Sequence, residues 1–261
     1  MPLAHTLDIN ADMGESYGRW RLGDDAALMP FVSSANVACG FHAGDPGTMR
    51  RTVAIAREHD VAVGAHIGLP DLLGFGRREI AASTEEVRDY ATYQIGALQA
   101  IAAAEGVPLR HVKPHGALYA MCSREPEYAG AVAAAIADVD PALPLLLLNA
   151  DVGPAVERHG VTLVREAFVD LAYRPDGSLI IEAGKRAWDP ELVARRAVRL
   201  VQTGRIDTVD GGELPVRPAT ICVHGDAPNA VEVARAVRTA LEEAGVTVAP
   251  LRPGTSAATG G

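Results

Sequence analysis

The sequence has few cysteines, few aromatic residues and no long apolar run, and each scarcity excludes a class of protein. Its 261 residues include three cysteines, Cys39, Cys122 and Cys222, which form no CxxC pair, so neither a disulfide scaffold nor a zinc ribbon is expected. Aromatic residues make up 5% of the chain, too few for the stacking platforms that bind single-stranded nucleic acid. The longest purely apolar stretch, residues 145–148, is far too short to cross a membrane.

The net charge of −9 argues against nucleic acid and anionic membranes as partners, because an acidic surface repels both. The first residues lack the basic and long apolar segments of a signal peptide. We therefore expect a cytoplasmic protein.

Apolar runs and breaker residues predict strands that alternate with helices. The predicted strands lie near residues 6–10, 33–38, 61–66, 109–113, 144–149, 161–165 and 219–223. Periodicity and capping signals predict helices over residues 48–59, 83–105, 189–203 and 228–244. Strands separated by helices pair in parallel through right-handed crossovers. About seven such units predict an α/β fold, a (β/α)7-8 TIM-like barrel, with an open doubly wound sheet as the alternative.

We expect a single barrel domain over residues 1–252. Asp-Gly pairs at 176–177 and 210–211 are hairpin signals, with short strands predicted at 178–182, 206–209 and 213–216. They predict a small β-hairpin insertion, with one helix, over about residues 173–218. Residues 253–261 are predicted to form a disordered tail.

Five strand candidates end in His, Asp, Asn or Lys beside glycine, a pattern that suits an active site built from several loops. In a barrel all these loops converge on one end, which favours the barrel over the open sheet. Asp8, Asn10 and Asp12 share one face of the first strand, since they are spaced two residues apart. Asp12 is a candidate base or metal ligand; the alternative is that these residues only end a strand and cap a helix.

Four histidines follow strands at equivalent positions and are predicted to belong to the site: His42, His66, His115 and His224. Asp45 and Asp226 repeat one motif, in which an imidazole is followed by glycine and a carboxylate. The motif also suits a divalent metal, but no HExxH or HxH pair is present, so the presence of a metal stays open. The remaining histidines are interpreted as structural: His5, His59, His111 and His159.

Basic and acidic residues near other strand ends complete the predicted site. Lys113 is a candidate for holding an anion or a developing oxyanion, and Arg77 and Arg78 for binding a carboxylate or phosphate. Glu166 and Asp170 follow the sixth strand. Two common nucleotide-binding motifs, GxxxxGK(S/T) and GxGxxG, are absent from the sequence. We interpret Cys39 and Cys222 as buried small hydrophobic residues rather than nucleophiles.

Together these segments resemble the LamB/YcsF family, the A component of the bacterial 5-oxoprolinase. The resemblance covers about residues 7–245 and is carried by these motifs: DINADMGE at 8–15, SANVACGFHAGD at 34–45, GAH at 64–66, GFGRR at 74–78, VKPHGALY at 112–119, EAFVD at 166–170 and CVHGD at 222–226. Ala11, Ile67 and Leu171 depart from the family, which usually has Cys, Pro and Arg there. The loss of the cation at 171 affects an anion contact of that loop.

The resemblance implies a barrel of the glycoside hydrolase/deacetylase type. It also implies ATP-dependent hydrolysis of 5-oxoproline to L-glutamate, with Mg-ATP as cofactor and the B and C subunits of 5-oxoprolinase as partners. On this reading Asp12 and one of His42, His66 or His224 are base or metal ligands. Lys113 and His115 face the carbonyl oxygen or phosphate. The residues expected to bind the cofactor or substrate anion are Asn10, Asn36, Arg77 and Arg78.

Two other functions remain open on the sequence. A stand-alone metal-dependent deacetylase or amidohydrolase would contain stoichiometric metal and need no ATP. A non-catalytic component would bind substrate and present it to its partners.

Overall fold

The protein is described by a computed structural model over residues 6–180 and 187–251. Parallel strands form a closed barrel in the order β1 (Thr6–Met13), β2 (Ser34–Ala38), β3 (Ala62–Ile67), β4 (Leu109–Pro114), β5 (Leu145–Leu147), β6 (Leu163–Phe168) and β11 (Thr220–Cys222). β11 pairs with β1, aligning Asp8 with Thr220, and this pairing closes the sheet. The closure confirms the predicted barrel and excludes the open sheet. β12 (Thr247–Val248) adds to the first residues of β1.

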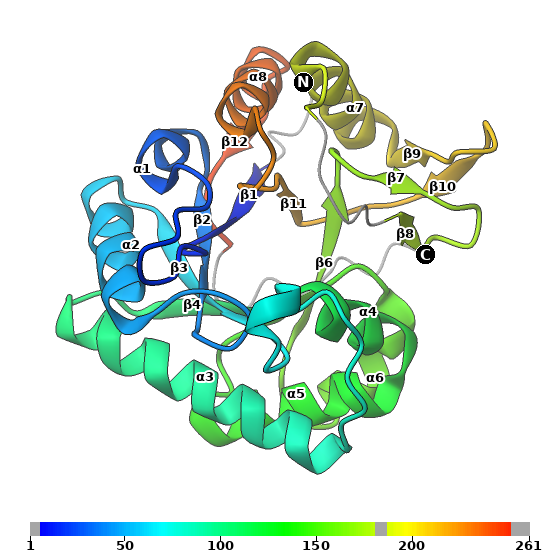
Figure 1. Cartoon of the computed structure of the whole chain (residues 1–261). Coiled ribbons are helices and arrows are strands. Elements are labelled where there is room, and N and C mark those ends of the chain that lie inside the picture. The colour runs from blue at the N-terminus through cyan, green and yellow to red at the C-terminus, as the bar shows by residue number, and fades with distance from the viewer. Residues whose placement is uncertain (1–5, 181–186, 252–261) are drawn as a thin grey trace.

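Helices surround the barrel on its outer face (Figure 1). They are α1 (Asp25–Leu28), α2 (Pro46–Glu58), α3 (Thr84–Ala104), α4 (Gly116–Arg124), α5 (Pro126–Val139), α6 (Gly153–Glu157), α7 (Pro190–Thr203) and α8 (Ala230–Glu243), with short 3-10 turns η1 (Met29–Phe31), η2 (Leu72–Gly74) and η3 (Ala150–Val152). Among the described helices, none has the length and hydrophobicity needed to span a bilayer.

The predicted helices form where their capping signals stand. The Ser83 hydroxyl accepts from the Glu86 backbone, and the Glu86 carboxylate accepts from the Ser83 backbone, so the predicted capping box opens α3. Asp45 caps α2, Pro46 occupies its first turn, and His59 is its C-cap. His59 thus has the structural position that the sequence predicted.

β1 explains how one strand supplies both the core and the site. Its residues are buried from Leu7 to Met13. Leu7, Ile9, Ala11 and Met13 belong to the apolar core, whereas the alternating polar residues bond to side chains from other strands of the barrel. The apolar face therefore packs against the helices, and the polar face fills the barrel interior.

The described part of the insertion after β6 contains two hairpins. β7 (Ala172–Tyr173) pairs antiparallel with β8 (Leu179–Ile180), and β9 (Arg205–Asp207) pairs antiparallel with β10 (Glu213–Pro215). The turns at both Asp-Gly pairs, three of the four strands and the intervening α7 lie near their predicted positions, but the prediction named one small hairpin and did not include β7. Residues 181–182 of the predicted hairpin strand, His5 and the predicted disordered tail lie outside the described residues.

Candidate active site

Polar side chains inside the barrel are stacked in layers that begin with Asp8. Its carboxylate accepts from Ser33, Ser34 and Thr220 at 2.5–2.7 Å. Burial raises the pKa of Asp8, opposed by these hydrogen bonds. This layer forms the polar floor of the barrel interior.

The second layer joins Asn10 to Asn36. The Asn36 amide donates to Asn10 Oδ1 at 2.7 Å and to Asp12 Oδ1 at 2.9 Å, and its own oxygen lies 2.6 Å from His111 Nε2. Asn10 donates to Glu166 at 2.8 Å and to Thr220 at 2.7 Å. Both asparagines are fully buried. Their amides are engaged inside the barrel, so the structure does not present them to a cofactor.

Lys113 belongs to the next layer, where its side chain contacts residues of β1, β6 and β11. Its ammonium contacts Asp12 Oδ1 at 3.0 Å, Asn10 Oδ1 at 3.1 Å, Glu166 Oε1 at 3.1 Å and Cys222 Sγ at 3.0 Å. Burial opposes its charge, but Asp12, Cys222 and Glu166 raise the pKa of Lys113 well above its usual value. Burial likewise opposes the charge of Asp12, but His66 and Lys113 hold the pKa of this carboxyl well below its usual value. The result is a buried ammonium–carboxylate pair.

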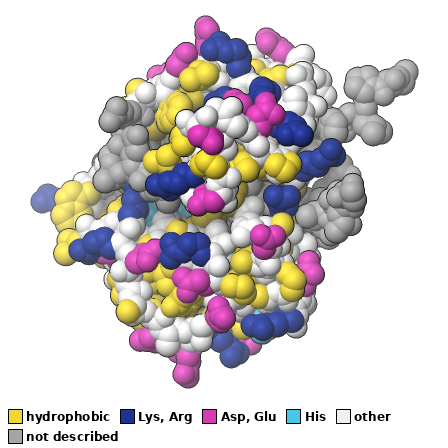
Figure 2. All heavy atoms as spheres, turned by 90° about the vertical axis from the view of Figure 1, so that its right-hand side faces the viewer, with side chains coloured by type: hydrophobic (Ala, Val, Ile, Leu, Met, Phe, Trp, Pro, Cys, Tyr) yellow, Lys and Arg dark blue, Asp and Glu magenta, His cyan; other side chains and the backbone are white. Residues whose placement is uncertain are grey.

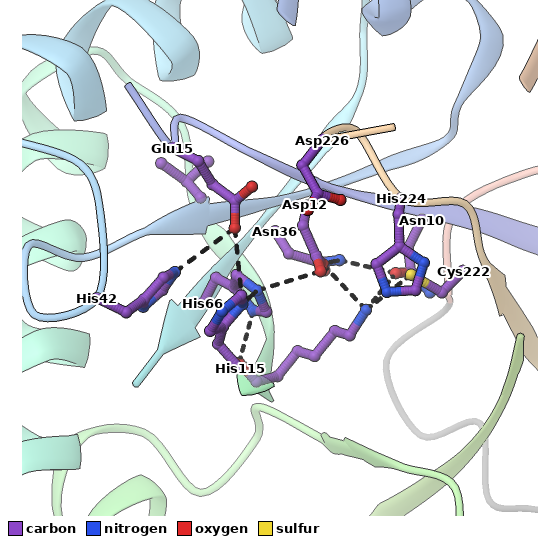
Figure 3. A network of polar contacts seen from close by, with 12 residues as sticks. Asn10, Asp12, Glu15, Asn36, His42, His66, His115, Cys222, His224 and Asp226 are labelled. Atoms are coloured by element: carbon purple, nitrogen blue, oxygen red, sulfur yellow. Dashed lines mark hydrogen bonds and ion pairs between the residues drawn. The ribbon is translucent and has the colours of Figure 1, made fainter. Parts of the chain in front are cut away.

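Three histidines and Glu15 lie together beside Asp12 (Figure 3). His66 Nε2 lies 3.3 Å from Asp12 Oδ2 and 2.9 Å from His115 Nδ1. The His42 ring stacks on His115 with a centroid distance of 3.9 Å. Burial lowers the pKa of both His42 and His115 well below the usual value. These two imidazoles are therefore neutral at neutral pH.

His224 forms a dyad with Asp170. Its Nδ1 lies 2.9 and 3.0 Å from the two Asp170 oxygens, and its backbone N–H donates to the same carboxylate at 2.8 Å. The ring stacks on Phe168, and 14% of the side chain stays exposed. Asp170 thus fixes the orientation of an imidazole that borders a pocket.

Among the other predicted site residues, Asp226 and Arg77 form an ion pair of 2.5 Å at the edge of the site. Asp45 and Arg78 lie apart from the histidines. The Asp45 carboxylate accepts from Gly18 and from the first turn of α2, and Arg78 pairs with Asp71. The structure therefore brings most of the predicted residues together, whereas Asp45 and Arg78 make local structural contacts.

Three residues of the cluster were not predicted as site residues: Glu15, His111 and Cys222. Glu15 lies one residue beyond Gly14, which has φ +68°, and there the period of two that marks β1 no longer applies. Cys222 is buried, as predicted, but its sulfur contacts the Lys113 ammonium, so the interpretation as a merely hydrophobic residue was incomplete. This contact depends on the pairing of β11 with β1, which aligns Cys222 with Asn10. Local sequence patterns do not indicate such a pairing.

A small pocket of about 50 Å³ opens at this end of the barrel. It is lined by Asp12, His66, Arg77, Lys113, Pro114, His115, Gly116, Tyr119, Phe168, Leu171, Leu179 and His224. A larger cavity of about 750 Å³ adjoins it, since Tyr119 and Leu179 line both. Arg124, Arg165 and Arg174 line the larger cavity, and Figure 2 shows Lys and Arg side chains around a hollow on this side of the molecule.

Among the described residues, two groups of side chains lie close enough to share an ion. One consists of Asp12, Cys222 and His224, but the Lys113 ammonium already contacts Asp12 and Cys222 there. The other consists of Glu15, His42, His66 and His115, whose carboxylate and ring nitrogens converge on one another.

Comparison with known proteins gives the family. Residues 7–256 match the LamB/YcsF family. The chain belongs to the LamB/YcsF family. The A subunit of 5-oxoprolinase from Thermus thermophilus is 54% identical over 93% of this chain and 98% of its own, and that of Pyrococcus abyssi is 49% identical over 94% and 98%.

Solved structures agree with this membership. The LamB/YcsF chain superposes on the lactam utilization protein of Thermus thermophilus with a TM-score of 0.87 and 52% identity, covering 94% of this chain and 99% of the other. A putative cellobiose-phosphate cleavage protein of Enterococcus faecalis gives a TM-score of 0.57 at 14% identity, over 95% and 97% of the two chains, and indicates only a shared fold.

Proposed function

We propose that this LamB/YcsF protein hydrolyses 5-oxoproline to L-glutamate as the A component of an ATP-dependent 5-oxoprolinase. Relatives that share about half of its residues over nearly their whole length carry the name of that component. The observation that carries the proposal is the His224–Asp170 dyad, which faces a small pocket beside a buried ammonium–carboxylate pair. A base, a fixed positive charge and a confined space are what opening a lactam requires.

The pocket suits a small substrate. A cavity of about 50 Å³ has room for a few waters, at roughly 10–15 Å³ each, and so for a small ring but not for a nucleotide. Arg77 lines the pocket and supplies a cation for the carboxylate of 5-oxoproline. Leu171 lines it too, so the anion contact rests on Arg77 rather than on residue 171.

His224 is the general base in this proposal. A carboxylate only accepts hydrogen bonds, so Asp170 holds the proton on Nδ1 and leaves the lone pair on Nε2. From there the imidazole removes a proton from the water that attacks the lactam carbon, and it returns a proton to the ring nitrogen as the C–N bond breaks. Asp170 is a positioning residue, because it acts through His224.

Lys113 contributes its charge rather than a free proton. An ammonium has three N–H donors, and four acceptors from Asn10, Asp12, Glu166 and Cys222 already surround it. A direct bond from Lys113 to the lactam oxygen would displace one of these partners. In the proposal, the fixed positive charge instead stabilises the negative charge on that oxygen and on the phosphoryl group that it receives.

Coupling to ATP and to the B and C subunits belongs to the same proposal. Lactam opening is unfavourable near neutral pH. Transfer of a phosphoryl group from ATP to the lactam oxygen would release ADP and make the ring carbon electrophilic. Attack by water and cleavage of the ring C–N bond would then give an acyl phosphate, whose hydrolysis releases phosphate and glutamate. The relatives are named as one lettered component of 5-oxoprolinase, which implies further components in their complexes. If the nucleotide binds this chain, the larger cavity has a suitable volume and three arginines. Arg165 Nε is buried there without a hydrogen-bond partner among the described residues.

The test is an omission experiment. The chain is mixed with candidate B and C subunits, ATP, Mg²⁺ and 5-oxoproline, and glutamate and ADP are measured with each component left out in turn. The proposal predicts products only in the complete mixture. Glutamate formed by this chain alone without ATP would instead indicate a stand-alone amidohydrolase. Full activity in a mixture that lacks this chain would contradict the proposal.

A further inference from the structure

Glu15, His42, His66 and His115 form a compact group of potential metal ligands. They come from four separate segments, the loops after β1 and β2 and the ends of β3 and β4 (Figure 3). One ligand atom from each lies within 4.8 Å of the others, and each residue is at most 7% exposed. The group is therefore shielded from water.

Two backbone carbonyls fix where the protons of His66 and His115 lie. His66 Nδ1 is 3.0 Å from the Lys113 carbonyl oxygen, and His115 Nε2 is 2.8 Å from the Phe75 carbonyl oxygen. A carbonyl oxygen only accepts hydrogen bonds, so these two nitrogens carry the N–H groups. In the neutral rings the opposite nitrogens, His66 Nε2 and His115 Nδ1, then carry lone pairs.

These two lone pairs face each other at 2.9 Å. Carboxylates add further negative charge, since Asp12 Oδ2 lies 3.3 Å from His66 Nε2 and Glu15 Oε1 lies 3.6 Å from His115 Nδ1. Lone pairs and carboxylates at such distances repel unless a cation lies among them. The cation is either a proton shared by the two imidazoles or a metal ion.

The surroundings of His42 distinguish the metal ion from the shared proton. It is fully buried, and neither of its ring nitrogens has a hydrogen-bond partner among the described residues. Its Nε2 lies 3.7 Å from Glu15 Oε1, on the same side as the other ligand atoms. A proton shared by His66 and His115 would leave His42 unsatisfied, whereas a metal ion would bind all four groups.

We propose that Glu15, His42, His66 and His115 bind one divalent transition-metal ion, with Zn²⁺ as the best match. Three imidazoles and one carboxylate suit zinc and its neighbours, whereas Mg²⁺ and Ca²⁺ prefer oxygen ligands alone. The carbonyl bonds of His66 and His115 are the outer contacts that orient histidine ligands at metal sites. A bound ion of this kind would supply a Lewis acid beside the pocket.

His42 has to turn to reach the ion, because its ring now lies parallel to that of His115. It has no hydrogen bond to another described residue to lose when it turns. Gly68 leaves the room for this ring, since a Cβ there would come within 2.5 Å of His42 Nδ1. The metal site does not depend on the proposed 5-oxoprolinase activity, because it follows from contacts within this chain.

The test measures metal binding directly. The purified chain is stripped with a chelator and titrated with Zn²⁺ and with Co²⁺, while metal content, visible absorption of Co²⁺ and the thermal midpoint are recorded. We expect one ion per chain, a raised midpoint with Zn²⁺ and absorption bands of cobalt bound by nitrogen and oxygen ligands.

Two variants locate the site and one serves as control. We expect His42→Ala and the isosteric Glu15→Gln each to weaken metal binding at least about tenfold. His59→Ala removes an exposed histidine and should bind the ion like the original chain. Circular dichroism of each stripped variant verifies that it is folded. No binding to the folded original chain, or unchanged binding in Glu15→Gln, would overturn the proposal and leave a shared proton as the cation.

Discussion

Replacing Lys113 by methionine tests the buried charge pair on which the site is built. Methionine keeps an unbranched side chain, one heavy atom shorter, and removes the ammonium. Asp12 Oδ1 and Glu166 Oε1 then lose a cation at 3.0 and 3.1 Å, in a region where Glu166 is fully buried and Asp12 is 7% exposed. Two carboxylates would share the barrel interior without this counter-ion.

The expected loss of stability is large. Removal of one partner from a buried ion pair costs about 3–5 kcal/mol, because the remaining charge stays buried and unpaired. For a domain near this size each kcal/mol lowers the thermal midpoint by roughly 2–4 °C, so a drop of roughly 6–20 °C is expected. An exposed pair offers a matched control: Arg88→Met breaks the contact with Asp138, in which both side chains are about half exposed, and should cost less than about 1 kcal/mol.

The pH dependence of the folding stability tests the buried pair more sharply. The pKa of Asp12 is depressed, so its contribution is present above the unfolded value of about 3.9 and is lost as the pH falls through the folded value. The pKa of Lys113 is raised, so its contribution is present below about 10.4 and is lost as the pH rises through the folded value. The pair therefore stabilises the fold between about pH 4 and pH 10.

Urea denaturation of the original chain and of Lys113→Met at pH 7 and pH 4 measures how much the pair stabilises the fold. In Lys113→Met the unpaired carboxylates take up protons on acidification, so the difference from the original chain should shrink at pH 4. Equal stability of the two chains at pH 7 would show that the buried pair does not stabilise the fold. An Arg88→Met variant as unstable as Lys113→Met would show that burial of the pair makes no difference.

Three further substitutions have expected outcomes. Asp45→Ala removes the cap of α2 and should lower the free energy of unfolding by about 1 kcal/mol in urea denaturation. Hydrogen bonds with Thr48 and Gly18 lower the pKa of Asp45 to about 2. The loss of stability should therefore be present at neutral pH and fade only in strong acid. Asp170→Asn should lower kcat about 100-fold or more in the reconstituted complex with little change in KM, since it disturbs the orientation and tautomer of His224; an unchanged kcat would remove the dyad from the mechanism. Gly68→Ala places a Cβ 2.5 Å from His42 Nδ1 and should lower the thermal midpoint. The same substitution at Gly96 should not, because a Cβ there would meet nothing within 4 Å apart from its chain neighbours and the backbone of its own helix.

Much of the fold could be predicted because its signals are local. The strands begin and end within a few residues of the predicted positions, and the capping residues Ser83 and Asp45 mark where α3 and α2 begin. The closure of the barrel was inferred only from the number of strand–helix units. It depends on the pairing of β11 with β1, in which Asp8 and Thr220 are 212 positions apart.

The site could be predicted as a set of residues but not as a set of contacts. Period two on β1 correctly placed Asp8, Asn10 and Asp12 on one face of the strand. It did not indicate that the side chains of Asn10 and Asn36 would both be engaged inside the barrel. Nor did it indicate that four acceptors would surround Lys113, because these come from β1, β6 and β11.

Asp45 shows that a shared sequence motif does not always predict a shared role. His42 and Asp45 share a sequence motif with His224 and Asp226, yet the Asp45 carboxylate caps α2 while Asp226 pairs with Arg77. A carboxylate two or three residues after a histidine serves either purpose, and only the direction of the chain after the intervening glycine decides. The start of α2 at Pro46 sets that direction for Asp45.

The most direct test of the proposed mechanism is the rate of glutamate formation by the reconstituted complex when this chain carries His224→Gln. Glutamine removes the base but keeps a side chain of similar reach beside Asp170 and Phe168. A general base at this position predicts a rate at least about 100-fold below that of the original chain and of His59→Ala, with an unchanged thermal midpoint. A rate within about twofold of the original chain would rule out His224 as the base.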